Sequence, residues 1–225
     1  MLEANKSTWF EKIFRVYNRR LFKRKFDSFR VCGLENLRQK NPKTPLIIYA
    51  NHSSWWDGLA AFEISRAAQL DAFVMMEEKQ LRKLFLFRKL GAFSVVRKNP
   101  REAIKSVNYA AGLLKENSRR TLWIFPQGEI LPNDSRPLNF FHGLSRVVEK
   151  TEKCAVVSAA MRYEFFGNFK PEILVKINLP EQFSVDKNFD AKKKTIEFEN
   201  ELTETLDNLK SEILTKNLQG YENIF

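Results

Sequence analysis

A histidine and an aspartate stand five residues apart where an apolar run of the sequence ends. The run PLIIYA (45–50) leads into Asn51 and His52, and Asp57 follows after two serines and two tryptophans. An imidazole titrates near neutral pH, and a carboxylate on its other ring nitrogen fixes the tautomer and stabilises the imidazolium. This spacing therefore favours proton-transfer chemistry on a hydroxyl group.

Each of these two residues also has a purely structural explanation. Ser54 is a good helix N-cap, and Asp57 three residues later fits a capping box at the positive end of a helix. His52 can be a loop imidazole that closes the strand. Neither Ser53 nor Ser54 stands in a G-x-S-x-G turn, so a serine nucleophile is the weaker alternative and the attacking hydroxyl is expected to belong to the substrate.

The elements around the pair predict an α/β fold. Helical spacing appears between most strand-like runs, as in LAAFEISRAAQL (59–70). The runs rich in β-branched and aromatic residues are 45–50, 72–76, 92–96, 121–126, 154–161 and 172–177. Two later helices have one apolar face each, formed by Ala103, Ile104, Val107, Ala111 and Leu114, and by Leu202, Leu206, Leu209 and Ile213. We therefore expect one domain with a mostly parallel or mixed central sheet flanked by helices, and sites beyond the carboxyl ends of its strands.

Three ordered segments resemble the sequence blocks of one enzyme family. NHSSWWD (51–57) looks like the N-H-x-x-x-x-D signature of the lysophospholipid (glycerolipid) acyltransferases. GAFSVVR (91–97) is similar to the family's G-x-F/I-x-x-x-R block, and IFPQGE (124–129) is similar to its F-P-E-G-T-R block. The resemblance covers residues 45–160. It implies acyl transfer from acyl-CoA or acyl carrier protein to a lipid hydroxyl, with His52 as general base, Asp57 as its orienting partner, and no metal or other cofactor.

The resemblance also implies which residues bind the acceptor. The family analogue of Arg97 contacts the acceptor's phosphate, and the following Asn99, Pro100 and Glu102 predict a helix N-terminus, which is a ready anion site. The expected substrate-binding residues are Asn51, Arg97, Gln127, Gly128, Glu129 and Arg136. The default acceptor is a lysophospholipid such as 1-acylglycerol-3-phosphate.

Several positions depart from the family's pattern. The third block usually continues Glu-Gly-Thr-Arg, where this chain has Gln127, Gly128, Glu129 and Ile130, and Arg136 is the candidate replacement for the absent arginine. Three further departures follow: Ser158 stands for a proline of the late strand, Phe141 stands for a lysine, and the adjacent His142 is expected at the surface or at a helix start. These changes leave the base chemistry intact. They open the alternative of a non-phosphate acceptor such as a glycolipid or an aminolipid.

Composition narrows the class of partner. The 225 residues, 44% of them hydrophobic, suit one globular domain, and a net charge of +11 favours anionic partners. RNP-like, KH-like and zinc-finger patterns are absent, so nucleic acid is not expected, whereas 20 Phe and four Trp among many cations suit a membrane lipid surface. Cys32 and Cys154 match no CxxC spacing, which argues against a metal or redox site.

Residues 1–30 are expected to form an amphipathic, membrane-facing helical segment before an acyltransferase domain at 31–225. One arc of the helix gathers Trp9, Phe10, Ile13, Phe14, Tyr17 and Leu21, with Lys12, Arg15 and Arg19 opposite. The alternative is a helix that packs on the domain. KQLRKLFLFRKLG (79–91) has apolar residues all round and predicts either a half-inserted segment or a buried connecting helix.

Together these observations predict a peripheral enzyme on the cytoplasmic face of a membrane. The first residues lack the apolar core of a signal peptide, and no apolar run reaches the length of about 18 residues that a span requires. The sequence sets no oligomeric state. A catalytically silent lipid-binding protein of the same fold is the remaining alternative. The intact His52 and Asp57 argue against silence, whereas the altered later blocks argue for an altered substrate specificity.

Overall fold

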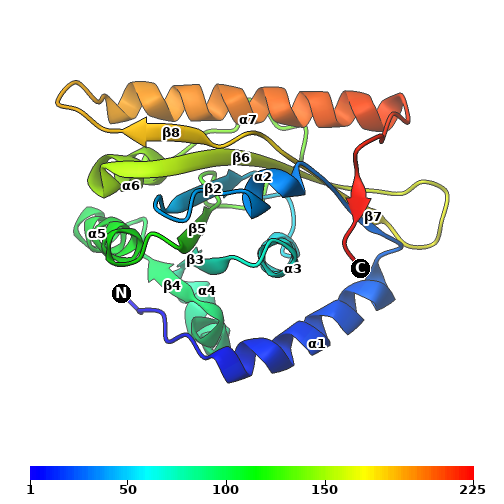
Figure 1. Cartoon of the computed structure of the whole chain (residues 1–225), viewed down its shortest axis with the longest axis horizontal. Helices are drawn as coiled ribbons and strands as arrows, with labels where there is room; N and C mark the ends of the chain where they lie inside the picture. The colour runs from blue at the N-terminus through cyan, green and yellow to red at the C-terminus, as the bar shows by residue number, and fades with distance from the viewer.

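A mixed nine-stranded sheet runs through the centre of the protein in the computed structural model, which describes residues 1–225 (Figure 1). The sheet order is β4 (Ala92–Val95), β3 (Asp71–Glu77), β5 (Arg120–Ile124), β2 (Leu46–Ala50), β6 (Lys153–Glu164), β7 (Glu172–Ile177), β1 (Phe29–Cys32) and β9 (Glu222–Asn223). The first five strands of this order are parallel. Strand β7 is antiparallel to β6, and β8 (Glu181–Ser184) also pairs antiparallel with β6. The predicted α/β fold is confirmed.

Helices cover both faces of the sheet. One hydrophobic cluster packs the sheet against α1 (Thr8–Lys25), α2 (Leu34–Arg38) and α3 (Asp57–Ala67). The other packs it against α5 (Pro100–Glu116), α6 (Gly143–Thr151) and α7 (Ala191–Leu214), and Figure 1 shows α7 and α1 on opposite sides of the molecule. Leu46, Ile48 and Ala50 of β2 join the first cluster, and Ile47 and Tyr49 join the second. A strand buried on both faces therefore reads as a continuous apolar run.

The predicted strands are all present, and the helix faces are correct with one exception. Leu202, Leu206, Leu209 and Ile213 of α7 are buried as expected. On α5, however, Ile104 is 56% exposed, whereas Ser106 is fully buried. The Ser106 hydroxyl donates to the Ser94 carbonyl of β4 at 2.9 Å, and this bond helps to turn the Ser106 side of the helix toward the sheet. The short strands β1, β8 and β9 were not predicted.

The segment 79–91 is not a single helix. It forms α4 (Glu78–Lys83) and, after Leu84, the 3₁₀ helix η1 (Phe85–Leu90). Gly91 ends η1 with φ +97°, and a Cβ at this position would lie 2.7 Å from the Ala72 carbonyl oxygen. Phe85 remains exposed, so the segment is not the buried connecting helix that one alternative expected.

Helix α1 combines the two alternatives considered for it. Phe22 and Asn18 are buried, and the Asn18 amide donates to the Glu63 carboxylate of α3 at 2.7 Å, so the helix packs on the domain. A second row of side chains, one step around the helix, faces outward. This exposed stripe consists of Trp9, Ile13, Val16 and Tyr17. None of the helices is both long and apolar enough to cross a membrane.

Candidate active site

The carboxyl ends of four adjacent parallel strands meet at one edge of the sheet. His52 follows β2, the loop 125–129 follows β5, Glu77 ends β3 and Arg97 follows β4. Because these strands are neighbours in the sheet, residues far apart in sequence gather at this edge. The three sequence blocks are therefore brought together by strand order.

The imidazole of His52 is bonded to the Asp57 carboxylate. The distance from Nδ1 to Oδ2 is 2.8 Å, and Asp57 is fully buried while the His52 side chain keeps 23% of its surface exposed. An ionised carboxylate can only accept, so Nδ1 carries the proton of the neutral imidazole. The lone pair then lies on Nε2, which is the nitrogen available as a base.

The Asp57 carboxylate is held by three further donors. Oδ2 also accepts the backbone N–H groups of Ser53 at 2.7 Å and Ser54 at 2.9 Å, and Oδ1 accepts the hydroxyl of Tyr163 at 2.6 Å. Helix α3 begins at Asp57 itself, with Trp56 at the N-cap, so the expected N-cap at Ser54 is wrong. Only the bond from the Ser54 N–H to Asp57 is present from the expected capping box, because the Ser54 hydroxyl accepts the Trp56 N–H and the Asp57 N–H bonds to the Ser54 carbonyl.

Tyr163 is the residue that sequence reasoning missed. Burial raises the pKa of its phenol well above the usual value, and the charge and hydrogen bond of Asp57 raise it further. The phenol therefore stays protonated and donates to Asp57. It lies 106 residues away on β6 and reaches the site because β6 pairs with β2. No local motif marks it.

No serine hydroxyl bonds to His52. The Ser54 hydroxyl accepts the Trp56 N–H at 3.3 Å, and the buried Ser53 hydroxyl has no hydrogen-bond partner. Neither hydroxyl is therefore hydrogen-bonded to the imidazole as a serine nucleophile would be.

The loop after β5 connects His52 with Arg97. The Gln127 side-chain oxygen accepts the His52 backbone N–H at 2.7 Å, and the next residue, Gly128, lies against the Arg97 guanidinium. Gly128 has φ +68°, and a Cβ there would lie 2.3 Å from Arg97 Nη1, so the close approach requires glycine. Glu129 follows at the exposed rim.

Arg97 is paired with an acidic residue. Its Nε donates to Glu77 Oε2 at 2.9 Å, and its guanidinium carbon lies 5.2 Å from the centre of the Phe141 ring. Asn99 caps α5 as predicted, accepting from the Arg101 and Glu102 N–H groups. The Glu102 carboxylate accepts from Lys105 and makes no bond to the Asn99 N–H, so it does not complete a capping box.

Two of the expected substrate-binding residues have their polar groups engaged by other parts of the protein. The Asn51 amide is buried and bonds the Met161 backbone of β6 at 2.8 and 2.9 Å. Arg136 bonds Asp207 of α7 at 2.5 Å. His142 precedes α6 as expected, and its Nδ1 lies 3.0 Å from the Thr195 hydroxyl.

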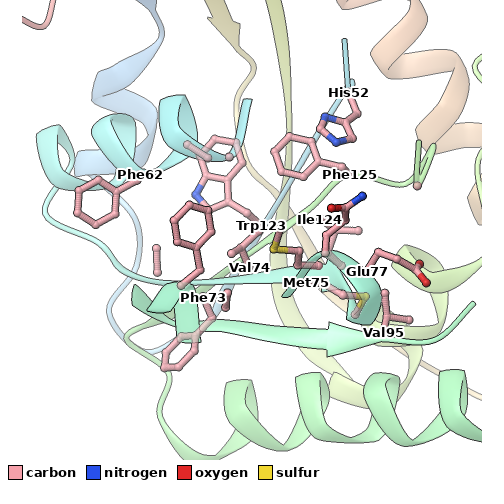
Figure 2. A pocket seen from close by; sticks show the side chains of 18 of the residues that line it. His52, Phe62, Phe73, Val74, Met75, Glu77, Val95, Trp123, Ile124 and Phe125 are labelled. Atoms are coloured by element: carbon pink, nitrogen blue, oxygen red, sulfur yellow. The ribbon is translucent and has the colours of Figure 1, made fainter. Parts of the chain in front are cut away.

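A cavity of about 740 Å³ opens beside His52. Twenty-four of its 37 lining residues are hydrophobic, so it offers an apolar space with few charged groups. Figure 2 shows His52 and Phe125 toward one end, Phe62 and Phe73 toward the other, and Trp123 and Val74 between them. No group of three or more His, Cys, Asp or Glu side chains is placed to hold a metal ion.

Comparison with protein families identifies the chain. The model of the acyltransferase family, which comprises the lysophospholipid acyltransferases, matches residues 28–162. The protein belongs to this family. Among curated proteins, no sequence matches the chain. The matched part of the acyltransferase includes His52, Asp57, Arg97 and the loop 125–129. The match ends within β6, at Arg162.

We predict that His52→Ala abolishes acyl transfer without unfolding the protein, because the variant lacks the nitrogen that we expect to act as the base and His52 is only partly buried. Thioester consumption and circular dichroism on one preparation measure the two effects. Ser53→Ala is the matched control, since its hydroxyl bonds to nothing. An inactive Ser53→Ala protein with normal stability would point instead to a serine nucleophile.

We predict that Asp57→Asn lowers both the rate and the stability. The amide has one acceptor oxygen and a donor NH₂, so it cannot serve four donors, and an unsatisfied buried group costs about 1–3 kcal/mol. Thermal melting and kcat are the measurements. A variant with wild-type kcat would show that the carboxylate only supports the fold.

Proposed function

We propose that this acyltransferase moves a fatty acyl group from an acyl thioester, acyl-CoA or acyl-loaded carrier protein, to the hydroxyl of a membrane lipid. The observation that carries the proposal is the His52 imidazole, held at Nδ1 by Asp57 and lining an apolar cavity. A general base beside a space for a hydrocarbon chain suits a lipid hydroxyl as the nucleophile.

The proposed reaction is direct transfer. His52 Nε2 takes the proton of the acceptor hydroxyl while its oxygen forms a bond to the thioester carbonyl carbon. The tetrahedral intermediate then collapses, the carbon–sulfur bond breaks, and the imidazolium returns its proton to the leaving thiolate. Asp57 stabilises the imidazolium between these two transfers. The Gly128 N–H is bonded to the Phe125 carbonyl at 3.0 Å, so it is not free to donate to the oxyanion of the intermediate.

The apolar part of the cavity suits the acyl chain. Beyond His52 it is lined by Val74 of β3, Trp123 of β5 and Phe62 of α3, and it continues to Phe14 of α1 and Phe87 of η1. Its volume falls within the range of small-molecule sites, which are mostly apolar with a few placed polar groups. The chain would therefore run from the sheet edge toward α1.

The surface of α1 supports attachment to a membrane. The exposed stripe of Trp9, Ile13, Val16 and Tyr17 is followed on the same side by Arg20 and Arg24, which line a shallow groove with Ile13 and Leu21. Aromatic and aliphatic groups next to cations suit the boundary between acyl chains and anionic head groups. We propose that residues 1–30 hold the enzyme at the cytoplasmic face of the membrane.

The intact dyad weighs against a silent lipid-binding protein. A buried carboxylate and an imidazole with a free nitrogen serve no evident packing purpose at the mouth of a cavity, whereas proton transfer uses both. Acylation of one lyso-species by purified protein, lost in His52→Ala, would decide for the enzyme.

We predict that Val74→Phe shortens the acyl chain that the enzyme accepts. The larger ring would fill the middle of the cavity, so kcat/KM should fall at least tenfold for a long-chain thioester and little for a short-chain one. A series of donors of increasing chain length provides the measurement and its own control. An equal loss for every length would place the chain elsewhere.

We predict that replacing Trp9 and Val16 together by serine weakens binding to anionic vesicles without lowering the melting temperature, because both side chains are exposed. Vesicle sedimentation at two salt concentrations measures binding, which should also fall as salt screens Arg20 and Arg24. Phe22→Ala is the contrasting variant, since Phe22 is fully buried and its loss should destabilise the fold by about 3–5 kcal/mol. Unchanged vesicle binding by the double variant would contradict the attachment.

A further inference from the structure

The cavity beside His52 differs in charge from the rest of the protein. The chain carries +11, yet the Asp, Glu, Lys and Arg residues that line the cavity comprise three carboxylates and two guanidiniums: Glu11, Glu77, Glu129, Arg66 and Arg97. At neutral pH this lining carries one excess negative charge. A phosphate monoester has a charge between −1.5 and −2 at pH 7, so such a lining would hold it poorly.

Two of the charged groups at the active end, Arg97 and Glu77, form an ion pair, and the third, Glu129, lies at the exposed rim. The Arg97 Nε is occupied by Glu77 Oε2, while the two terminal nitrogens of the guanidinium make no hydrogen bond within the protein and lie by Gly128 and the Phe141 ring. Glu77 likewise uses one carboxylate oxygen and keeps the other free. Both side chains are 32% exposed, which leaves a ligand access to each.

The pair lies at the end of the cavity where the reaction would take place. Figure 2 shows Glu77 at the same end as His52, and Phe73, four residues earlier on β3, toward the opposite end. Four residues of strand span about 13 Å, so the charged end and the apolar end are well separated. Arg97 and His52 contact the consecutive residues Gly128 and Gln127, which places the pair close to the base.

We propose that the acceptor, within the function proposed above, carries a zwitterionic head group. Its single anionic group binds the terminal nitrogens of Arg97, and its ammonium binds the free oxygen of Glu77. A doubly charged phosphate is repelled by Glu77, and a simple cation is repelled by Arg97. A neutral head group would desolvate both charges without compensating them. A zwitterion compensates both, with charge-assisted hydrogen bonds on each side.

Two classes of acceptor carry a zwitterionic head group of this kind. One is a lysophospholipid with an amino alcohol, such as lysophosphatidylethanolamine, in which a phosphodiester supplies the negative charge. The other is an amino-acid amphiphile that bears a hydroxyl, a carboxylate and a free ammonium. Arg97 binds either anion, because a planar guanidinium matches both carboxylate and phosphate oxygens.

The test compares acceptors of one chain length with the full-length enzyme. The panel is lysophosphatidylethanolamine, lysophosphatidylglycerol, lysophosphatidate, monoacylglycerol and a hydroxylated amino-acid amphiphile with a free ammonium. We expect the highest kcat/KM for one of the two zwitterions, and the better one identifies the class of acceptor. Lysophosphatidate as the preferred acceptor would overturn the proposal.

Glu77→Gln removes the charge that reads the ammonium. We expect kcat/KM for the preferred zwitterion to fall at least tenfold while that for lysophosphatidate rises, because a charged hydrogen bond is lost on one and a repulsion on the other. Glu11→Gln is the matched control, since it removes the same charge from the same cavity and should leave the order of acceptors unchanged. Glu77→Asp should retain the wild-type order, which guards against a misfolded Glu77→Gln protein.

Two failures are distinguishable in this experiment. If Glu77→Gln lowers kcat/KM for all acceptors by one common factor, Glu77 does not select the head group, and the head-group proposal fails. The proposed acyl transfer is unaffected by this result. If no acceptor is acylated and His52→Ala changes nothing, the proposed acyltransferase reaction itself is contradicted.

Discussion

The site depends on the hydrogen bonds that hold the buried carboxylate of Asp57. A buried charge is tolerated only where hydrogen bonds replace its water, and Asp57 receives four, from two backbone N–H groups, the His52 imidazole and the Tyr163 hydroxyl. Each donor constrains a different part of the molecule. The loop after β2 must curl around the carboxylate, α3 must start at residue 57, and β6 must lie beside β2.

The order of the parallel strands converts this local arrangement into a binding site. Since β5 lies between β2 and β3, its loop reaches His52 through Gln127 and the Arg97 guanidinium through Gly128. The same strands, with α3 and η1, enclose the apolar cavity. His52, the Glu77–Arg97 pair and the apolar cavity are thus held together at one sheet edge.

The parts of the site that the sequence predicted are those determined by local patterns. Apolar runs ending in polar residues located the strand ends, and the spacing of His52 and Asp57 suggested their contact, because five residues across a turn bring two side chains together. Contacts between distant segments left no such signal. Tyr163 on β6 bonds to Asp57, which follows the neighbouring strand β2, and Glu77 at the end of β3 bonds to Arg97, which follows the neighbouring strand β4.

Contacts between distant segments also explain why two residues that were expected to bind substrate are engaged within the protein instead. Asn51 follows the strand as the motif suggests, but its amide closes a pair of bonds with the Met161 backbone. Arg136 has the right charge for a replacement, but Asp207 of α7 engages its guanidinium. Helical periodicity predicted one apolar arc on α1. It could not show that one row of side chains in this arc packs on the domain while a second row stays exposed.

Intact-protein mass spectrometry shows whether the acyl group passes directly from the thioester to a lipid hydroxyl or first to the protein. The protein is mixed with an acyl thioester first alone and then with a lipid acceptor, while the released thiol is measured. Direct transfer predicts no acylated protein, and release of thiol only after the acceptor is added. A stable acyl adduct on the protein, formed without acceptor and discharged when acceptor arrives, would contradict it.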